Sequence, residues 1–238
     1  MTNRLTNAAL SALLLGTMSS TAFASSIIAN GSFETDVVPV GFYTSFGCGP
    51  TITSWTVLCP QGSDVAIVSG SFNQSGFSFP AQEGVQWLDL TGVNSNAGEG
   101  VQQTVATSAG TVYVLSFWVG NVSDPGGPFG ITSTVEVDIN GAFAGLFSNS
   151  GGTTTQTWEQ FTLPILATGG STTIAFINRD PSSDYHNGLD NISLNAIPEP
   201  ATLLLFGTGT AALRLLRRRK GSDLRSTNSV AAHETILG

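Results

Sequence analysis

Residues 25–196 of this chain are predicted to form an all-β domain, a β-sandwich of the jelly-roll type. Gly, Ser and Thr are abundant there, and helix-forming residues are scarce. Short runs rich in β-branched and aromatic residues alternate with Gly, Pro and Asn, which is the pattern of strands and turns. About ten such runs fit into this length, and that spacing is typical of a two-sheet sandwich.

The expected strands follow one another at short intervals. They cover residues 51–57, 64–69, 85–91, 100–107, 111–119, 132–139, 142–147, 158–164, 172–178 and 188–195. Val135, Val137 and Ile139 alternate with polar residues, which favours a strand with one face in water. The strand at 111–119 is apolar on both faces and is expected to be covered on both sides. Asn140-Gly141 predicts a tight hairpin between two of the strands.

Aromatic residues in the long connections are the candidates for ligand binding. Sugar binding needs an apolar platform for the ring faces, with polar groups nearby for the hydroxyls. The segment 72–79 is interpreted as a loop that carries three phenylalanines, which solubility does not require. The candidate ligand-binding residues are Tyr43, Phe72, Phe77, Phe79 and Tyr185. The alternative is that these rings tuck under their own loops, as the four tryptophans are expected to fill the core.

Cys48 and Cys59 are the only cysteines in the chain. In an oxidising export compartment they are expected to form a disulfide across the first long loop. The chain-entropy relation gives roughly 3 kcal/mol of stabilisation for a loop of this size. Two cysteines without a nearby histidine do not supply the ligands of a zinc site.

Residues 25–196 are strongly acidic. They contain thirteen Asp and Glu residues against Arg179 alone, which gives about twelve net negative charges. This charge excludes nucleic acid as a partner by repulsion. Calcium and neutral polysaccharide are compatible with it, and solubility alone is a sufficient explanation.

We find no sequence motif for catalysis. The segment has one histidine, His186, and it lacks a Gly-x-Ser-x-Gly elbow, a His-Glu-x-x-His helix and a P-loop. Nothing singles out one carboxylate pair for glycoside hydrolysis. Asp184 and His186 are expected to shape a loop before the last strand, or to line a ligand edge. We therefore predict that the protein is not an enzyme.

The two ends of the chain predict export. Arg4, an apolar stretch at 8–16 and Ala22-Phe23-Ala24 make residues 1–24 a cleavable signal peptide. Near the other end, the apolar run 201–213 would span only about 20 Å as a helix, against roughly 30 Å of hydrocarbon. Extended to residue 216, it predicts a short transmembrane helix, although a buried core helix with a basic end is the alternative. Positive charges at 217–220 would hold its end in the cytoplasm.

The C-terminal segment 197–220 resembles the PEP-CTERM protein-sorting domain. The resemblance rests on three features in order, namely a Pro-Glu-Pro signature, an apolar run and a basic cluster. The residues that carry it are Pro198, Glu199, Pro200, Arg217, Arg218 and Arg219. The resemblance implies processing by an exosortase at the inner membrane, followed by delivery to the envelope surface or the extracellular matrix. Residues 221–238 extend beyond the usual end of such domains and are expected to be a disordered polar tail, whether a mis-assigned stop, a frameshift scar or a genuine cytoplasmic extension.

A second resemblance covers the predicted sandwich. The segments that carry it lie at residues 30–34, 53–55, 87–90, 101–104, 113–121 and 188–194. Their order is similar to that of choice-of-anchor proteins, whose domain is a galactose-binding-like jelly roll related to carbohydrate-binding modules. The resemblance implies a structural Ca²⁺ between Glu34 and Asp190, completed by further oxygens. Alternatively, Glu34 and Asp190 are edge polar residues that pair the terminal strands.

Together these observations predict an exported, non-catalytic protein of the exopolysaccharide matrix with a carbohydrate-binding-like domain. Its partners would be an exosortase, a polysaccharide and, before processing, the inner membrane. The alternative is a structural or adhesive acidic matrix protein that binds no specific sugar.

Overall fold

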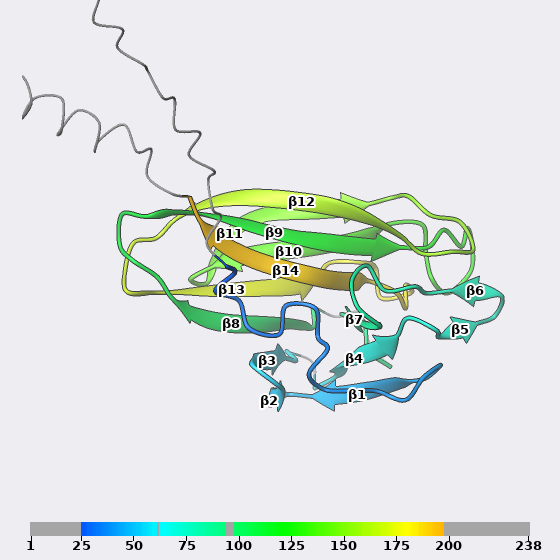
Figure 1. Ribbon diagram of the computed structural model, residues 1–238. Helices are drawn as coiled ribbons and strands as arrows, with labels where there is room; N and C mark the ends of the chain where they lie inside the picture. The colour runs from blue at the N-terminus through cyan, green and yellow to red at the C-terminus, as the bar shows by residue number, and fades with distance from the viewer. Residues whose placement is uncertain (1–24, 61, 94–97, 198–238) are drawn as a thin grey trace, which may run out of the picture. The chain divides into compact units, whose positions relative to one another are not determined.

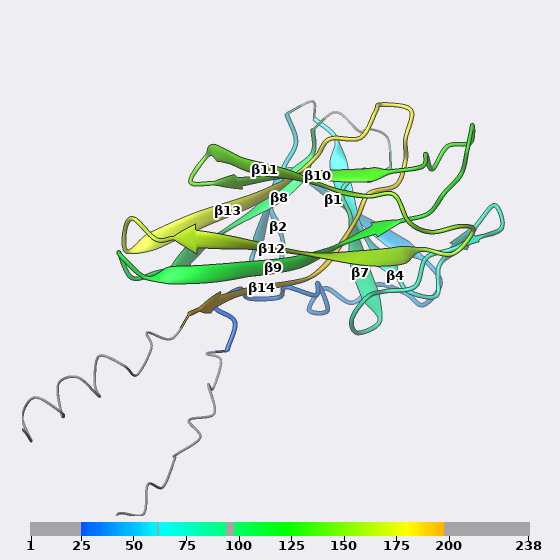
Figure 2. The ribbon, with the colours of Figure 1, turned by 90° about the horizontal axis from the view of Figure 1, so that it is seen from above.

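The computed structural model describes residues 25–60, 62–93 and 98–197, and these contain strands and turns but no helix. Twelve of the strands form two antiparallel six-stranded sheets that face each other, as Figures 1 and 2 show. The predicted all-β sandwich is therefore confirmed. The predicted signal peptide, membrane helix, sorting signature and polar tail lie outside the described residues. Within the described residues we find no helix long and apolar enough to cross a membrane.

The first sheet contains both the edge strand that follows the N-terminal segment and the last strand of the sandwich. In spatial order it consists of β1 (Tyr43–Gly47), β4 (Asp64–Ser69), β7 (Gln86–Asp89), β14 (Gly188–Ala196), β9 (Val112–Asn121) and β12 (Thr157–Leu166). The second sheet consists of β11 (Ala142–Asn149), β10 (Ser133–Ile139), β13 (Ser171–Asn178), β8 (Gly100–Ala106), β3 (Trp55–Leu58) and β2 (Gly49–Ile52). Strands distant in sequence thus lie side by side, and β14 runs between β7 and β9.

The alternating strand and the tight hairpin are found as predicted. Val135 and Val137 are fully buried and Ile139 is partly buried against the core, while Thr134, Glu136 and Asp138 are partly exposed. Asn140 and Gly141 join β10 to β11 with φ angles of 53° and 76°. These left-handed conformations suit a two-residue hairpin turn, and Asn and Gly adopt them at least cost.

Two predicted segments differ from the structure. The single strand expected at 51–57 is two strands, because Ser54 adopts a φ of 70° and turns the chain between β2 and β3. The loop expected at 72–79 contains a short hairpin of β5 (Asn73–Gln74) and β6 (Phe77–Ser78), with φ angles of 52° at Ser75 and 85° at Gly76. Strand β1 was not predicted either.

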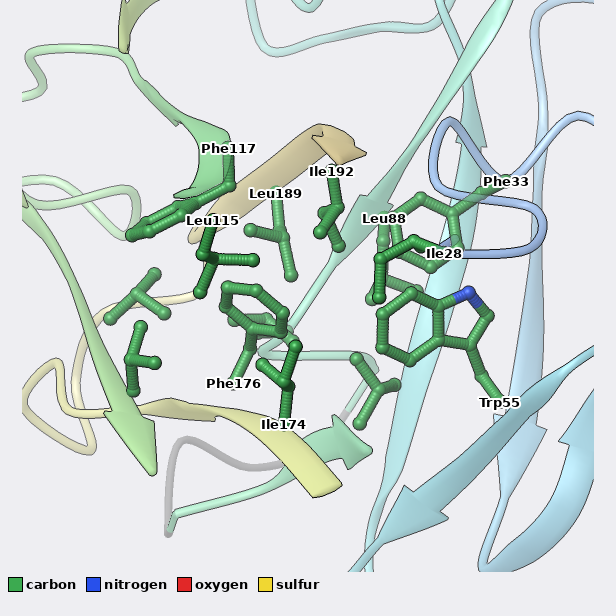
Figure 3. Close-up of a cluster of buried hydrophobic side chains, with 14 of the residues drawn as sticks. Ile28, Phe33, Trp55, Leu88, Leu115, Phe117, Ile174, Phe176, Leu189 and Ile192 are labelled. Atoms are coloured by element: carbon green, nitrogen blue, oxygen red, sulfur yellow. The ribbon is translucent and has the colours of Figure 1, made fainter. Parts of the chain in front are cut away.

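The core between the sheets is built from large apolar side chains of both layers. Figure 3 shows Phe117 and Leu115 from β9 facing Ile174 and Phe176 from β13. The Phe176 ring lies 5.1 Å from that of Phe117 and 6.2 Å from that of Trp55. At roughly 1.5–3 kcal/mol for each buried large side chain, this cluster is the main source of stability.

The opening segment of the domain is held against the closing strand. The Ile192 amide donates to the Gly31 carbonyl at 2.9 Å, and the Ile27 amide donates to the Leu194 carbonyl at 3.0 Å. A Cβ at Gly31 would lie 2.1 Å from the Ile192 carbonyl oxygen, so only glycine fits this close approach. Phe33 then enters the core beside Trp55, with 5.6 Å between their rings.

The predicted disulfide is present. Cys48 and Cys59 are bonded, with their Cα atoms 5.5 Å apart. Cys48 follows β1 of the first sheet, and Cys59 follows β3 of the second. The bond therefore links the β1 edge of one layer to the other layer.

Candidate functional site

A pocket lies on the outer face of the first sheet, away from the second sheet. Ala66, Val68 and Trp87 form its floor, because they alternate along β4 and β7 with residues of the inner core. The hairpin β5–β6 and the loops that contain Phe129 and Tyr185 cover this face, and Figure 1 shows the hairpin beside β4 and β7. Strand alternation thus provides one core between the layers and a second apolar cluster outside them.

The pocket has a volume of about 260 Å³, and six of its fifteen lining residues are Phe, Tyr or Trp. It is lined by Tyr43, Ala66, Val68, Phe72, Gln74, Ser75, Phe79, Trp87, Asp89, Gly92, Val93, Pro128, Phe129, Tyr185 and His186. Tyr43 meets Phe72 edge-on with 5.5 Å between the rings, and Phe72 lies 5.8 Å from Phe79. Such ring separations are those of favourable aromatic pairs, so the walls support one another.

Four of the five predicted ligand-binding residues come together in this pocket. Tyr43 and Tyr185 are each nearly half exposed at its rim, whereas Phe79 is buried inside. Phe72 also lines it, but Phe77 packs its ring 5.1 Å from Phe129 and stays outside the lining. Some of these rings therefore line a pocket, whereas Phe77 packs against another ring. Ligand binding by them stays a prediction.

His186 is a buried wall residue of the pocket. Its Nε2 lies 2.5 Å from Gln156 Oε1, and its ring is 5.3 Å from Phe79 and 5.5 Å from Trp87. Burial lowers the pKa of His186 to about 3, so the ring is neutral at ordinary pH. Because Gln156 Oε1 accepts, the proton belongs on Nε2. His186 therefore forms part of the pocket wall from the loop before β14, the place where the sequence led us to expect it.

Asp89 is the functional candidate that the sequence analysis missed. It follows Trp87 by two residues on β7, so both side chains point to the pocket. Asp89 Oδ1 accepts hydrogen bonds from the Thr91 amide at 3.0 Å, the Thr91 hydroxyl at 2.8 Å and the Asn187 amide at 3.1 Å. Burial nonetheless raises the pKa of Asp89 to about 7. An acidic residue two positions after a tryptophan within a strand was the signal available in the sequence.

A buried polar network continues from Asp89 into the second sheet. Asn187 Nδ2 donates to Asn178 Oδ1 at 2.7 Å, and the Asp180 amide donates to the same oxygen at 3.0 Å. Asp180 Oδ1 in turn accepts from the Thr134 amide at 2.6 Å. Burial raises the pKa of Asp180 to about 8 and that of Asp184 to about 7. These carboxyls hold protons near neutral pH, which removes the cost of burying several like charges together.

Glu34 and Asp190 bind the same short segment of chain. Glu34 Oε1 accepts from the amides of Val85 at 2.8 Å and Gln86 at 3.0 Å. Asp190 Oδ2 accepts from the amides of Gln82 at 2.9 Å and Glu83 at 3.1 Å. Both carboxylates thus fix the backbone at 82–86, just before β7, and so position the strand that carries Trp87 and Asp89.

The oxygens beside this segment fit calcium in kind, but they are few. The Ser32 hydroxyl donates to Glu83 Oε2, and the charge of Glu83 helps raise the pKa of Asp190, for which burial is the main cause. Calcium takes six to eight hard oxygen ligands, so main-chain carbonyls and water would have to supply the remainder. The described residues contain no group of three or more His, Cys, Asp or Glu arranged to hold a metal.

Calcium binding by Asp190 is tested by thermal melting of residues 25–197 with calcium and with a chelator. We expect calcium to raise the melting temperature, because a ligand at one hundred times its Kd stabilises by about 2.7 kcal/mol. Glu83→Gln should abolish this rise, whereas Glu159→Gln, exposed on β12, should preserve it. A melting temperature indifferent to calcium would leave Glu34 and Asp190 as anchors of the backbone only.

The comparisons with known proteins give two family matches. Residues 24–195 match the HpiC1-like family, described as HpiC1 cyclase, and residues 196–220 match the PEP-CTERM protein-sorting motif. The second match confirms the predicted sorting signal and indicates export directed to an exosortase. No curated protein matches the chain.

The structural comparison matches cyclases and, at a lower TM-score, a carbohydrate-binding module. The Stig cyclase Fisc from Fischerella sp. TAU is 20% identical with a TM-score of 0.54, and the match covers 74% of this chain and 99% of that one. An apo cyclase from Fischerella sp. gives the same identity and TM-score, covering 75% and 98%. TmCBM61, solved with β-1,4-galactotriose, is 16% identical with a TM-score of 0.43, covering 73% and 100%.

At 20% identity the two cyclase structures show the fold alone, and they do not establish whether this chain is a binding protein or an enzyme. The family match spans nearly the whole sandwich, from the residue before the predicted mature N-terminus to the last strand. The chain therefore belongs to the HpiC1-like family and carries a PEP-CTERM sorting motif directly after its sandwich.

Proposed function

We propose that this protein is exported, processed by an exosortase, and placed at the cell surface or in an exopolysaccharide matrix, where its sandwich binds carbohydrate without catalysis. The observation that carries the proposal is the aromatic pocket on the outer face of β1, β4 and β7. A protein that only presents an acidic surface has no need of a hollow lined by rings from five separate segments of the chain.

The pocket offers what a sugar ring requires. Phe72 and the nearly half-exposed Tyr43 and Tyr185 supply apolar faces for the C–H surfaces of a ring, above a floor that includes the buried Trp87. Polar groups at the margin can bond hydroxyls, namely the side chains of Gln74 and Ser75 at the hairpin turn. At about 260 Å³ the cavity is smaller than a typical drug-sized site, so it suits one ring of a longer chain.

Affinity electrophoresis of residues 25–197 in gels that contain the producing organism's own polysaccharide tests the proposal. Both sheets, both apolar clusters and the disulfide lie within this segment, so it can be produced alone. We expect retardation, weakened about tenfold by Phe72→Ala, because one stacking contact contributes on the order of 1.4 kcal/mol. Phe143→Ala, exposed on β11 of the other sheet, should bind like the parent.

Absence of retardation in every gel would contradict carbohydrate binding and favour a structural or adhesive acidic matrix protein. Retardation that Phe72→Ala and Phe143→Ala leave equally strong would place the binding outside the pocket. A melting curve for each variant shows whether it is folded, so that a loss of binding can be assigned to the removed ring.

One observation favours a second candidate, an acid-catalysed cyclisation. Asp89 places a carboxyl with a pKa of about 7 in an aromatic pocket, and such a group can donate a proton at neutral pH. The family is named for a cyclase, and a Fischerella cyclase of similar fold was solved with 4-(1H-indol-3-yl)butan-2-one. Titration of the segment with that compound separates the candidates, since binding of the indole without binding of any sugar would favour the cyclase.

A further inference from the structure

Asp89 offers one free carboxylate oxygen to the pocket. Its Oδ1 already accepts three hydrogen bonds, two from Thr91 and one from the Asn187 amide. No hydrogen bond from the described residues reaches Oδ2, and the residue lines the cavity. His186, the other buried polar residue of the wall, has its Nε2 engaged by Gln156, whereas Gln74 and Ser75 lie exposed at the margin. A ligand in the pocket therefore meets one strong, unsatisfied acceptor.

The surroundings of this acceptor are acidic. Asp64, which precedes Ala66 on the same face of β4, and Asp180 and Asp184 of the loop before β14 interact electrostatically with Asp89. Arg179 is the only Lys or Arg among the described residues, and it is paired with Glu136 at 2.8 Å. A positively charged ligand group would thus meet carboxyls and no competing cation of the described chain.

The aromatic walls also suit a cation. An ammonium group within about 6 Å of a Trp, Tyr or Phe face is attracted by the ring quadrupole, more strongly when water is excluded. Trp87 and Phe79 are buried beside Asp89, with 6.3 Å between their stacked rings. A buried carboxylate is costly without a partner and favourable with an opposite charge at contact distance.

We propose that the pocket takes a cationic amino sugar, with its free ammonium on Asp89 Oδ2 and its ring against Phe72 and the rim rings of Tyr43 and Tyr185. This inference rests on the proposed carbohydrate binding and names the class of sugar. A neutral sugar would leave Asp89 without a charged partner. An N-acetylated sugar would place a bulky neutral amide next to Asp89 Oδ2 in place of the ammonium group. An anionic uronic acid would be repelled.

The test compares three probes of equal length, the β-1,4-linked trisaccharides of glucosamine, N-acetylglucosamine and glucose. Isothermal titration of residues 25–197 at pH 7 is expected to show the glucosamine probe binding at least about tenfold more tightly than the other two. At pH 6 its binding should release about one proton per complex, because the ammonium ionises a carboxyl that is protonated in the free pocket. Titration in buffers of different ionisation enthalpy measures that proton.

Asp89→Asn should remove both the preference and the proton release, and Glu159→Gln on exposed β12 should change neither. Proton release by the unmodified protein tests the inference even if the Asp89 variant fails to fold. Equal binding of the three probes, or a preference that persists in Asp89→Asn, would overturn the amino-sugar inference and leave carbohydrate binding standing. Binding of none of the probes or of the producing organism's polysaccharide would overturn both.

Discussion

As the pH rises from 5.5 to 8, the sandwich is expected to lose at least about 3 kcal/mol of stability, or about 6–12 °C in melting temperature. The pKa values of Asp89 and Asp184 lie at about 7, and that of Asp180 at about 8, all raised by burial. A carboxyl with a raised pKa stabilises the folded state fully below its unfolded pKa near 4. That contribution is lost as the pH climbs through the folded pKa, because the unfolded chain then binds fewer protons.

The titration of His186 changes the stability in the opposite direction, but one histidine contributes less than the three carboxyls together. Its pKa is lowered to about 3, so its contribution is lost as the pH falls below the unfolded value near 6.5. The rise in stability on acidification should therefore be shallow between pH 8 and 7, where only Asp180 binds a proton on folding, and steepest between about pH 7 and 6.5, where all three carboxyls do. Below pH 6.5 it should continue less steeply, because His186 then opposes it. Measurements in a chelator keep calcium out of the comparison.

Asp180→Asn sharpens the test of this pH dependence. Asp180 Oδ2 is buried and has no hydrogen-bond partner among the residues that the structure describes, so ionisation gains no hydrogen bond from them. The amide keeps the Oδ1 acceptor for the Thr134 amide and cannot ionise, so the variant should be more stable than the parent at pH 8. Glu159→Gln, on the exposed face of β12, should follow the parent curve. Stability that rises steadily from pH 5.5 to 8 would contradict the assignment.

Periodicity in the sequence was sufficient wherever a strand buries alternate residues. Val135 and Val137 predicted the face of β10 correctly, and Asn140-Gly141 predicted its hairpin, because both signals are local. The turn at Ser54 and the hairpin turn at Ser75-Gly76 were missed. A non-glycine residue in the left-handed region is uncommon, and neither position carries the strongest turn signal.

The aromatic residues of the candidate site could be predicted from the sequence, but its buried acidic residue could not. Tyr43, Phe72, Phe79 and Tyr185 were singled out because aromatic residues in loops need an explanation. Asp89 was not, because its partner Asn187 lies 98 residues away in the sequence and the two meet only when β14 pairs with β7. Which of thirteen acids becomes buried and protonated depends on those long-range contacts.

Trp87→Ala is expected to destabilise the sandwich by about 3–5 kcal/mol, the largest effect of any single substitution proposed for this protein. Trp87 is 1% exposed, and its Nε1 donates to the Phe79 carbonyl at 3.0 Å. Its ring contacts Phe79, Trp158 and His186. Truncation therefore removes the centre of the apolar cluster outside the first sheet, here called the outer cluster, whose buried residues are Ala66, Val68, Phe79, Trp87, Val122 and Phe129. Denaturant unfolding measures the loss of stability.

Two further substitutions test whether the loss of stability in Trp87→Ala comes from the outer cluster. Trp87→Phe keeps most of the ring contacts and loses the hydrogen bond to Phe79, so it should cost less than half as much. Trp118→Ala, half-buried on β9, removes a ring of the same size from outside the cluster and should cost less than Trp87→Ala. Because Trp87 is also the floor of the pocket, ligand affinity should fall in Trp87→Ala under conditions where the variant is folded. Comparable costs for the two alanine substitutions would mean that the outer cluster contributes no special stability, and the pocket would then lack the rigid floor that sugar stacking requires.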